Sequence, residues 1–220
     1  MHCHILPGVD DGAQSMAESR EMLMAAKAVG ISRIVCTSHV RDPYFKGAET
    51  FEKMWNTFYA FEDVANAMGI KVHMGFEVNH HKLMELGMDW VEVLTTDGTT
   101  TLLLELSTAA SPSRFVDYER TIFELQARGC EVIIAHPERY LAIQDDIEIA
   151  ENLVRMGCRL QASADFMAGG RFGHEKKPAV RMLKAGLYTF IASDAHFPKH
   201  YEYFAKAHER YGNLLRPYRA

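Results

Sequence analysis

The sequence T-L-L-L-E-L at residues 101–106 places a glutamate directly after three leucines. A run this short and this apolar is typical of a strand buried on both faces, as in a parallel sheet covered by helices. The carboxylate of Glu105 needs a partner there, because burying an unpaired charge costs several kcal/mol. The stretch therefore predicts a parallel sheet with a cation or a metal ion beside this strand.

Apolar runs of this kind alternate with amphipathic helices along the chain. Ser15-Met16-Ala17-Glu18 has the S-x-x-E form that begins a helix, and Gly30 is expected to follow the end of that helix. With a first strand around His2 and His4, the order gives about seven strands, each followed by a helix. The other strands are expected over 31–38, 70–76, 101–106, 131–135, 158–163 and 187–193, and further helices over 50–68, 111–128, 145–156, 177–185 and from about 200.

This order predicts an α/β fold, a distorted (β/α)7 barrel of the TIM type, with its functional residues at the carboxyl ends of the strands. We expect a single domain over residues 1–220, since no linker, repeat or low-complexity segment interrupts the chain. An open doubly wound sheet is the alternative, but no G-x-G-x-x-G follows the first strand.

The composition excludes several classes of protein. The net charge of −5, without any basic run, argues against nucleic acid as a partner. No apolar run approaches the roughly 20 residues of a membrane span, and the first residues do not form a signal peptide. The four cysteines form no C-x-x-C pair, which favours reduced thiols. We therefore expect a soluble cytoplasmic protein, and the sequence does not predict its oligomeric state.

Potential metal ligands follow six of the seven expected strands. Because the carboxyl ends of parallel strands meet on one face, these residues are expected to form one centre. His2 and His4 are two residues apart, which in extended backbone points both side chains to the same side. The same holds for Asp194 and His196. The candidate ligands are His2, His4, Asp11, His39, Glu77, Glu105, His136, Asp194 and His196.

Single residues of this set also have simpler interpretations. A terminal His-x-His is often a disordered end or the remnant of a tag, and His39 alone could be a hydrogen-bonded loop residue. The remaining histidines do not follow strands in this way and are expected at the surface. They are His73, His80, His81, His174, His200 and His208.

The donor set limits the metal and the reaction. Imidazole and carboxylate without cysteine suit Zn, Mn or Fe, and nine ligands suit two or three ions. A centre of this kind favours hydrolysis. Three divalent ions exceed the four carboxylates by about two charges, which together with Arg139 favours a phosphate dianion as substrate. The simpler interpretation of Arg139 is a salt bridge with Glu138 or with another carboxylate at the barrel rim.

Taken in this order, the motifs resemble the PHP superfamily (polymerase and histidinol phosphatase domain). More narrowly, H-C-H-I-L-P-G-V-D-D-G at 2–12 together with A-H-P-E-R-Y at 135–140 is similar to the bacterial manganese-dependent tyrosine phosphatases of capsule and exopolysaccharide synthesis. The resemblance covers residues 1 to about 200. It implies a trinuclear centre in which manganese is the expected metal and iron or zinc the alternative.

The resemblance also implies how the ligands are shared, and it makes Asp10 a turn residue or a residue behind the ligands. One ion would be held by His2, His4, Glu77 and Asp194, a second by Glu77, Glu105 and His136, and a third by Asp11, His39 and His196.

By the same resemblance, a hydroxide formed at the metal centre attacks the phosphorus of phosphotyrosine while Arg139 binds the phosphate oxygens. Relatives often carry a second arginine shortly after S-D-x-H, where this chain offers Lys199 as the substrate contact. They also have a few residues before H-x-H, so the first strand is expected to be short here. The implied partner is a phosphotyrosine protein, such as the C-terminal tail of a bacterial tyrosine kinase.

Other functions can be weighed on the sequence. A cysteine-dependent tyrosine phosphatase needs an arginine six residues after its cysteine, and none of the four cysteines has one. An amidohydrolase-like barrel also begins with H-x-H, but it would need a lysine or a single bridging carboxylate on the fourth strand. A small-molecule phosphatase of the same superfamily, such as histidinol phosphatase, remains an alternative, as does a metal-binding regulatory module without catalytic activity.

Overall fold

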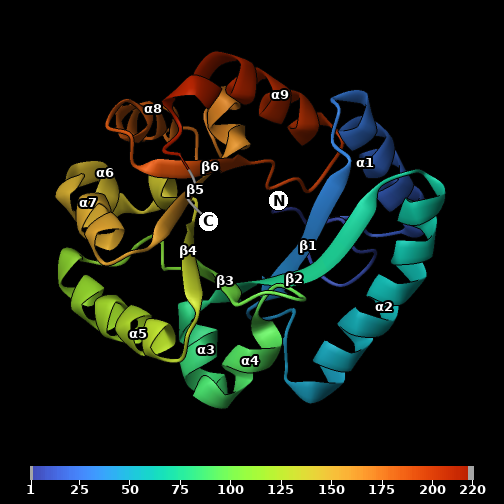
Figure 1. The fold of residues 1–220 in the computed structure, drawn as a ribbon, viewed down its shortest axis with the longest axis horizontal. Coiled ribbons are helices and arrows are strands. Elements are labelled where there is room, and N and C mark those ends of the chain that lie inside the picture. Colours follow the sequence, from blue (N-terminus) through green and yellow to red (C-terminus); the bar gives the residue numbers. More distant parts are fainter. Residues whose placement is uncertain (1, 218–220) are drawn as a thin grey trace.

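A computed structural model describes residues 2–217, whose strands curl into a ring enclosed by helices (Figure 1). The domain predicted over 1–220 also includes residues 1 and 218–220, which lie outside the described residues. Neighbouring strands pair in parallel and in chain order. They are β1 (Arg33–Val40), β2 (Lys71–Asn79), β3 (Thr101–Glu105), β4 (Glu131–Ala135), β5 (Arg159–Ser163) and β6 (Tyr188–Ala192).

The segment 2–4 takes the place of the predicted first strand. Cys3 forms one parallel bridge with Ala195, just after β6, and the backbone N–H of His4 donates to the carbonyl of Ala195 at 2.8 Å. On its other side, the N–H of Thr37 in β1 donates to the carbonyl of Cys3 at 2.9 Å. The segment thus connects both edges of the sheet. The predicted distorted barrel is confirmed, with its first strand reduced to this bridge within the described residues.

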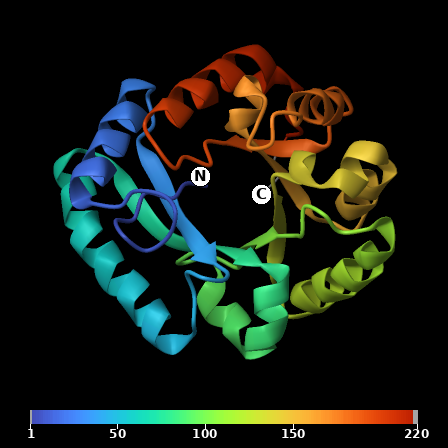
Figure 2. The same ribbon diagram turned by 180° about the vertical axis from the view of Figure 1, so that it is seen from behind.

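Helices cover the outside of the ring (Figure 2). The first begins after Ser15 as predicted, because the Ser15 hydroxyl accepts a hydrogen bond from the backbone N–H of Glu18 at 3.2 Å. None of the described helices is long and apolar enough to cross a membrane. The helices are α1 (Met16–Ala28), α2 (Ala48–Ala67), α3 (His80–Leu86), α4 (Val91–Leu94), α5 (Phe115–Ala127), α6 (Leu141–Asp145), α7 (Glu148–Arg155), α8 (Lys176–Lys184) and α9 (Lys199–Tyr211).

Two predicted helices differ in detail from the structure. The helix expected over 145–156 is α7 alone. The separate short helix α6 precedes it, and residues 146–147 between them are not helical. The helix expected from 111 begins with a 3-10 turn over Pro112–Arg114 before α5. That prediction rested on proline in the first turn of the helix. The pyrrolidine ring of proline fixes a backbone φ that suits a 3-10 turn as well as an α-helix.

Successive side chains of β3 face two different cores. Leu102 and Leu104 are buried in the main core, where the helices pack on the sheet. Leu103 belongs instead to a small cluster with Ile133 and Ala135. Leu103 and Ile133 also line a cavity of about 460 Å³. The interior of the ring is therefore less fully packed than the layer between strands and helices.

Leu104→Ala is expected to lower the free energy of unfolding by about 2–5 kcal/mol, because it empties a close-packed site. Leu103→Ala should cost clearly less, since its side chain already borders a cavity. Urea unfolding of both variants measures the difference, with the exposed Val93→Ala expected to stay within about 0.5 kcal/mol of the parent protein. Equal costs at Leu103 and Leu104 would contradict the two-core description.

Candidate metal centre

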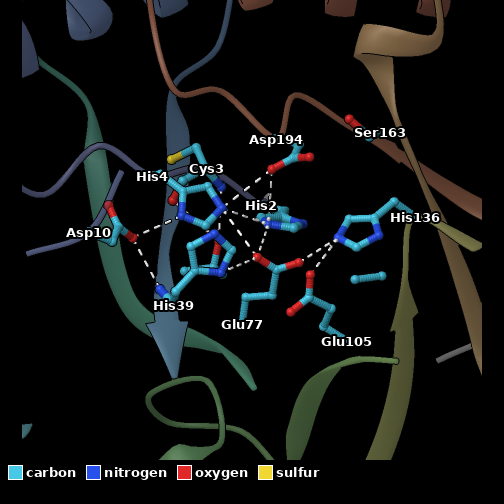
Figure 3. Close-up of polar contacts among 12 residues, drawn as sticks. His2, Cys3, His4, Asp10, His39, Glu77, Glu105, His136, Ser163 and Asp194 are labelled. Carbon is cyan, nitrogen blue, oxygen red and sulfur yellow. Dashed lines mark hydrogen bonds and ion pairs between the residues drawn. The ribbon is translucent and has the colours of Figure 1, made fainter. Parts of the chain in front are cut away.

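The nine predicted ligands lie together at the carboxyl ends of the strands. Figure 3 shows the side chains of His2, His4, His39 and Glu77 pointing toward one another, with His136 and Glu105 beside them. Within the described residues, three overlapping groups have ligand atoms within 4.8 Å of one another. The groups are His4, Asp11, His39 and His196; His2, His4 and Glu77; and His39, Glu77 and Glu105.

Four of these side chains have the spacing of ligands around one ion. The Nε2 atoms of His2 and His4 are 3.1 Å apart, and both lie 3.3 Å from Oδ1 of Asp194. Oε2 of Glu77 lies 3.3 Å from Nε2 of His2 and 3.4 Å from Nε2 of His4. Ligands bound about 2.1 Å from one ion are about 3.0–3.4 Å apart in tetrahedral or octahedral geometry. The four atoms therefore fit a single coordination shell.

Several buried atoms that face the centre lie within ion-pair distance of one another or of other ligand candidates, but they make no hydrogen bond of good geometry among the described residues. An unsatisfied buried polar atom costs about 1–3 kcal/mol, and both kinds of atom concerned, carboxylate oxygen and imidazole nitrogen, bind Mn, Fe and Zn. The donor set thus fits a centre with more than one metal ion. The atoms are Oδ1 of Asp11, Nδ1 of His39, Oε2 of Glu77, Oδ1 of Asp194 and Nε2 of His196.

Two histidines illustrate how the candidate ligands are shared in the structure. His136 joins the centre through Nε2, which lies 2.6 Å from Oε1 of Glu77 and 3.9 Å from Oε1 of Glu105. His39 lies between two groups, because its Nδ1 is 2.9 Å from Oε2 of Glu77 and its Nε2 is 3.2 Å from Oδ1 of Asp11. The assignment of each ligand to one particular ion stays a prediction.

Opposite charges set the protonation state of the two central carboxylates. Burial by itself would raise the pKa of Glu77, but the charges of His2 and His39 outweigh it and hold that pKa well below its usual range. Burial would also raise the pKa of Asp194, but the Arg139 guanidinium outweighs it and lowers the pKa. Both carboxylates are therefore ionised at neutral pH and available to a cation.

Asp10 lies behind the centre and orients His4. Its Oδ2 is 2.9 Å from Nδ1 of His4, which leaves Nε2 of His4 to face the centre. Asp10 also accepts hydrogen bonds from the backbone N–H groups of Gly12 at 3.0 Å and His39 at 3.1 Å. Burial would raise the pKa of Asp10, but the charge and hydrogen bond of His4 lower it to about 2. Asp10 thus orients a candidate ligand, in agreement with its expected place behind the ligands.

Two strained residues carry candidate ligands. His136 has φ 33° and Asp194 has φ 45°, both in the left-handed region that non-glycine residues rarely adopt. Such a conformation costs about 1–3 kcal/mol per residue. Both backbones are held by hydrogen bonds across the sheet, from His136 N–H to the carbonyl of Gln161 at 2.7 Å and from Asp194 N–H to the carbonyl of His2 at 2.9 Å. The sheet therefore fixes the direction of these two side chains.

Arg139 is buried beside the centre with one side of its guanidinium anchored. Its Nη2 lies 2.6 Å from Oδ2 of Asp194, 3.0 Å from Oδ2 of Asp165 and 3.2 Å from Oγ of Ser163. Its Nε has no hydrogen-bond partner among the described residues, and the residue lines a cavity of about 410 Å³ together with Glu105. Arg139 thus forms buried salt bridges with Asp165 and Asp194 and also faces the cavity.

The neighbouring Glu138 has a separate role in the structure. Its Oε1 accepts from the backbone N–H of Ser163 at 2.7 Å, and its Oε2 accepts from the hydroxyl of Tyr188, also at 2.7 Å. The sequence left Glu138 or another carboxylate at the barrel rim as the partner of Arg139. The ion pairs of Arg139 in the structure are with Asp165 and Asp194. Glu138 instead ties the 3-10 turn Pro137–Arg139 to β5 and β6.

Two further residues of the site, Gln161 and Asp165, belong to the region of β5 and were not predicted from the sequence. Oε1 of Gln161 lies 2.9 Å from Nδ1 of His2 and orients that ring, while Asp165 anchors Arg139. The strand 158–163 was the one predicted strand without a candidate residue at its end. The aspartate that follows it two residues later, in S-A-D at 163–165, was the available signal.

Two other predictions concern residues away from the ligands. Lys199, at the start of α9, does not line the cavity beside Arg139, and its Nζ lies 5.9 Å from the ring of Tyr203. Its contact with substrate stays a prediction that no described contact supports.

His80 was expected at the surface, and this was wrong. It is buried, with Nε2 2.9 Å from Oγ1 of Thr121, because it begins α3 on the side that faces α5.

Residues 1–207 match the family described as capsular polysaccharide synthesis, CpsB/CapC. The chain belongs to this family. Within it, the chain is 32% identical over 202 residues to the tyrosine-protein phosphatase YwqE of Bacillus subtilis strain 168, covering 89% of this chain and 76% of YwqE. It is 28% identical to the tyrosine-protein phosphatase CpsB of Streptococcus pneumoniae, covering 89% of this chain and 82% of CpsB. The family resemblance inferred from the sequence is thus confirmed.

Solved structures also match this chain. One comes from work on YwqE and CpsB, described as unique metal-dependent tyrosine phosphatases; it matches with a TM-score of 0.75 and 28% identity over 97% of this chain and 87% of that one. A TatD-like protein from Archaeoglobus fulgidus matches with a TM-score of 0.51 and 14% identity, over 96% of this chain and 91% of that one. The latter likeness concerns the fold alone.

Asp10→Asn is expected to weaken Mn²⁺ binding about 10- to 100-fold, because an amide cannot both orient His4 and accept the two backbone N–H groups. Titration calorimetry of the metal-free protein measures the change. Asp89→Asn, at an exposed position in the 3-10 turn Met88–Trp90, is the matched control and should leave the affinity unchanged. An unaltered affinity in Asp10→Asn would show that Asp10 does not act on the centre.

Proposed function

We propose that this member of the CpsB/CapC family is a metal-dependent protein-tyrosine phosphatase. It hydrolyses phosphotyrosine to tyrosine and phosphate and thereby regulates polysaccharide synthesis and export. The observation that carries the proposal is the position of Asp194. Its Oδ2 lies 2.6 Å from Arg139, and its Oδ1 faces the imidazoles of His2 and His4 at 3.3 Å. A cation suited to phosphate thus adjoins the candidate metal centre.

The proposed cofactors are two or three divalent ions, with manganese expected and iron or zinc as alternatives. When bound, such ions lower the pKa of water and neutralise charge that develops on the phosphate. The three overlapping ligand groups support more than one ion. The proposed ligands are His2, His4, Asp11, His39, Glu77, Glu105, His136, Asp194 and His196.

Arg139 is the proposed phosphate-binding residue. Asp165 and Asp194 anchor its guanidinium, so it needs little reorganisation when substrate arrives. Burial by itself would lower the pKa of Arg139, but these carboxylates outweigh it and raise the pKa, so the group stays charged. The anchored cation can therefore stabilise the negative charge of the phosphate during hydrolysis.

The cysteines do not provide an alternative nucleophile. Burial raises the pKa of Cys3 to about 11 and that of Cys158 to about 12, and it also raises the pKa of Cys36 and Cys130. All four thiols are thus protonated at neutral pH, whereas a phosphatase of the cysteine type uses a thiolate. This agrees with the absence from the sequence of the arginine that such an enzyme requires.

The substrate class is a phosphotyrosine protein, and the C-terminal tail of a bacterial tyrosine kinase is the specific substrate that we propose. The four free cysteines support a reducing compartment. We therefore propose that the protein acts in the cytoplasm, as a single domain over the described residues.

Arg139→Lys is expected to lower kcat/KM for a phosphotyrosine peptide about a hundredfold or more, because a point charge replaces a positioned planar donor. The assay uses the chelated protein with Mn²⁺ added back, with histidinol phosphate as a second substrate. Arg120→Lys, on the exposed face of α5, is the control. Metal content is measured in each variant, so that a loss of ions is separated from a loss of phosphate binding.

The parent protein should depend on the added metal and should prefer the peptide. A preference for histidinol phosphate would contradict the assignment and make the protein a small-molecule phosphatase. No turnover of either substrate by the metal-loaded protein would contradict catalysis and leave a metal-binding module.

A further inference from the structure

The segment G-G-R-F-G-H-E at 169–175 forms a loop beside the candidate centre, between the 3-10 turn Ala164–Ala168 and α8. Gly169, Gly170 and Gly173 have φ values of 108°, 81° and 83°. These are conformations that glycine adopts at low cost and other residues do not. The glycines therefore give the loop its path, and Arg171 and Phe172 lie at its tip.

Glu175 holds this loop from its buried side. Its side chain is fully buried, Oε1 accepts from the backbone N–H of Phe172 at 2.8 Å, and its own N–H donates to the carbonyl of Gly169 at 3.0 Å. A Cβ on Gly170 would lie 2.0 Å from Oε2 of Glu175, so only glycine fits there. The loop is thus a fixed support for two side chains that point away from the core.

Arg171 and Phe172 form one wall of the cavity of about 410 Å³ beside Arg139. Glu105 and Arg139 line the same cavity, so it opens onto the candidate metal centre. Phe172 is 52% exposed as a residue, and the Arg171 side chain is 48% exposed. The aromatic face of Phe172 is available to a ligand. The half-exposed guanidinium of Arg171, whose nearest described carboxylate is Asp11 at 3.8 Å, can also reach one.

The charged side chains that line this cavity are mostly arginines. Arg41, Arg139 and Arg171 line it together with one carboxylate, Glu105, although the chain as a whole carries a net charge of −5. Asp11 lies beside Arg41 and Arg171, with its Oδ2 3.3 and 3.8 Å from their Nη2 atoms, and offsets part of their charge. Arg139 lies deeper and is anchored. Positive charge is therefore placed at two depths, at the buried base of the cavity and at its exposed rim.

We propose that Arg171 and Phe172 select the substrate, which is a phosphotyrosine peptide with an acidic residue next to the phosphotyrosine. The Phe172 ring packs against the tyrosine ring, and the Arg171 guanidinium pairs with the acidic side chain. The phosphate itself binds at the base, at Arg139. This inference rests on the proposed function and names the substrate class of the same site.

The test compares three substrates of the Mn²⁺-loaded protein: an acidic phosphotyrosine peptide, the same peptide with its acidic residues changed to amides, and phenyl phosphate. Arg171→Gln is expected to raise KM for the acidic peptide about fivefold, as for a partly exposed ion pair. It should leave kcat, and KM for the other two substrates, unchanged. Arg120→Gln, an exposed arginine on α5, is the matched control and should change none of these values.

Phe172→Ala tests the aromatic contact independently. It is expected to raise KM about fivefold for both peptides and for phenyl phosphate, because all three present an aromatic ring. The matched control is Phe123→Ala, which should have no effect, because Phe123 is 70% exposed on α5.

An equal rise in KM for all three substrates in Arg171→Gln would overturn the proposal, since Arg171 would then bind the phosphate itself. Unchanged KM values would overturn it as well.

A non-hydrolysable phosphonate form of both peptides gives a second readout by fluorescence anisotropy. Tighter binding of the acidic form by the parent protein, with no such preference in the Arg171→Gln variant, supports the proposed role of the loop even if turnover fails. Equal binding of both forms contradicts it.

Discussion

The burial of Glu77 among four histidines is the constraint on which the rest of this structure depends. Its carboxylate is almost wholly buried, with Oε1 2.6 Å from His136 and Oε2 2.9 Å from His39. Both imidazoles of the 2–4 segment also lie within 3.4 Å of it. Removing so many polar groups from water is costly unless each of them is paired or binds a metal ion. Metal ions can bind the lone pairs of the carboxylate and of the imidazoles at the same time.

The fold supplies the positions that this constraint requires. Glu77 lies on β2, His39 on β1 and His136 directly after β4, while His2 and His4 enter on the segment that joins the two edges of the sheet. Parallel pairing in chain order brings these ends to one face. The surrounding side chains then fix the orientation of the ligands, as Asp10 does for His4 and Gln161 for His2. The strained backbones of His136 and Asp194 belong to the same arrangement.

The candidate ligands could be predicted from the sequence because each is a local event: a histidine or carboxylate directly after a short apolar strand. Glu105 in T-L-L-L-E-L illustrates this. Gln161 lies within β5 itself, and its contact with His2 depends on the closure of the barrel across 159 residues. His80 was misjudged for a similar reason, since its burial depends on the packing of α3 against α5. Non-local packing of this kind leaves no periodic pattern in the sequence.

The loop at 169–175 shows a different limit of sequence reasoning. Its glycines indicate a turn, but the direction in which Arg171 and Phe172 point follows from the buried hydrogen bond of Glu175. That contact could be found only once the loop and the start of α8 were placed together. The proposed site therefore combines a base that strand ends predict with a rim that only the three-dimensional structure reveals.

Anomalous diffraction from crystals grown with Mn²⁺ would test the metal centre most directly. We expect two or three anomalous peaks within the overlapping ligand groups, one of them bounded by His2, His4, Glu77 and Asp194. Crystals without such peaks, in which these side chains pair only with one another or with water at full Mn²⁺ saturation, would contradict it.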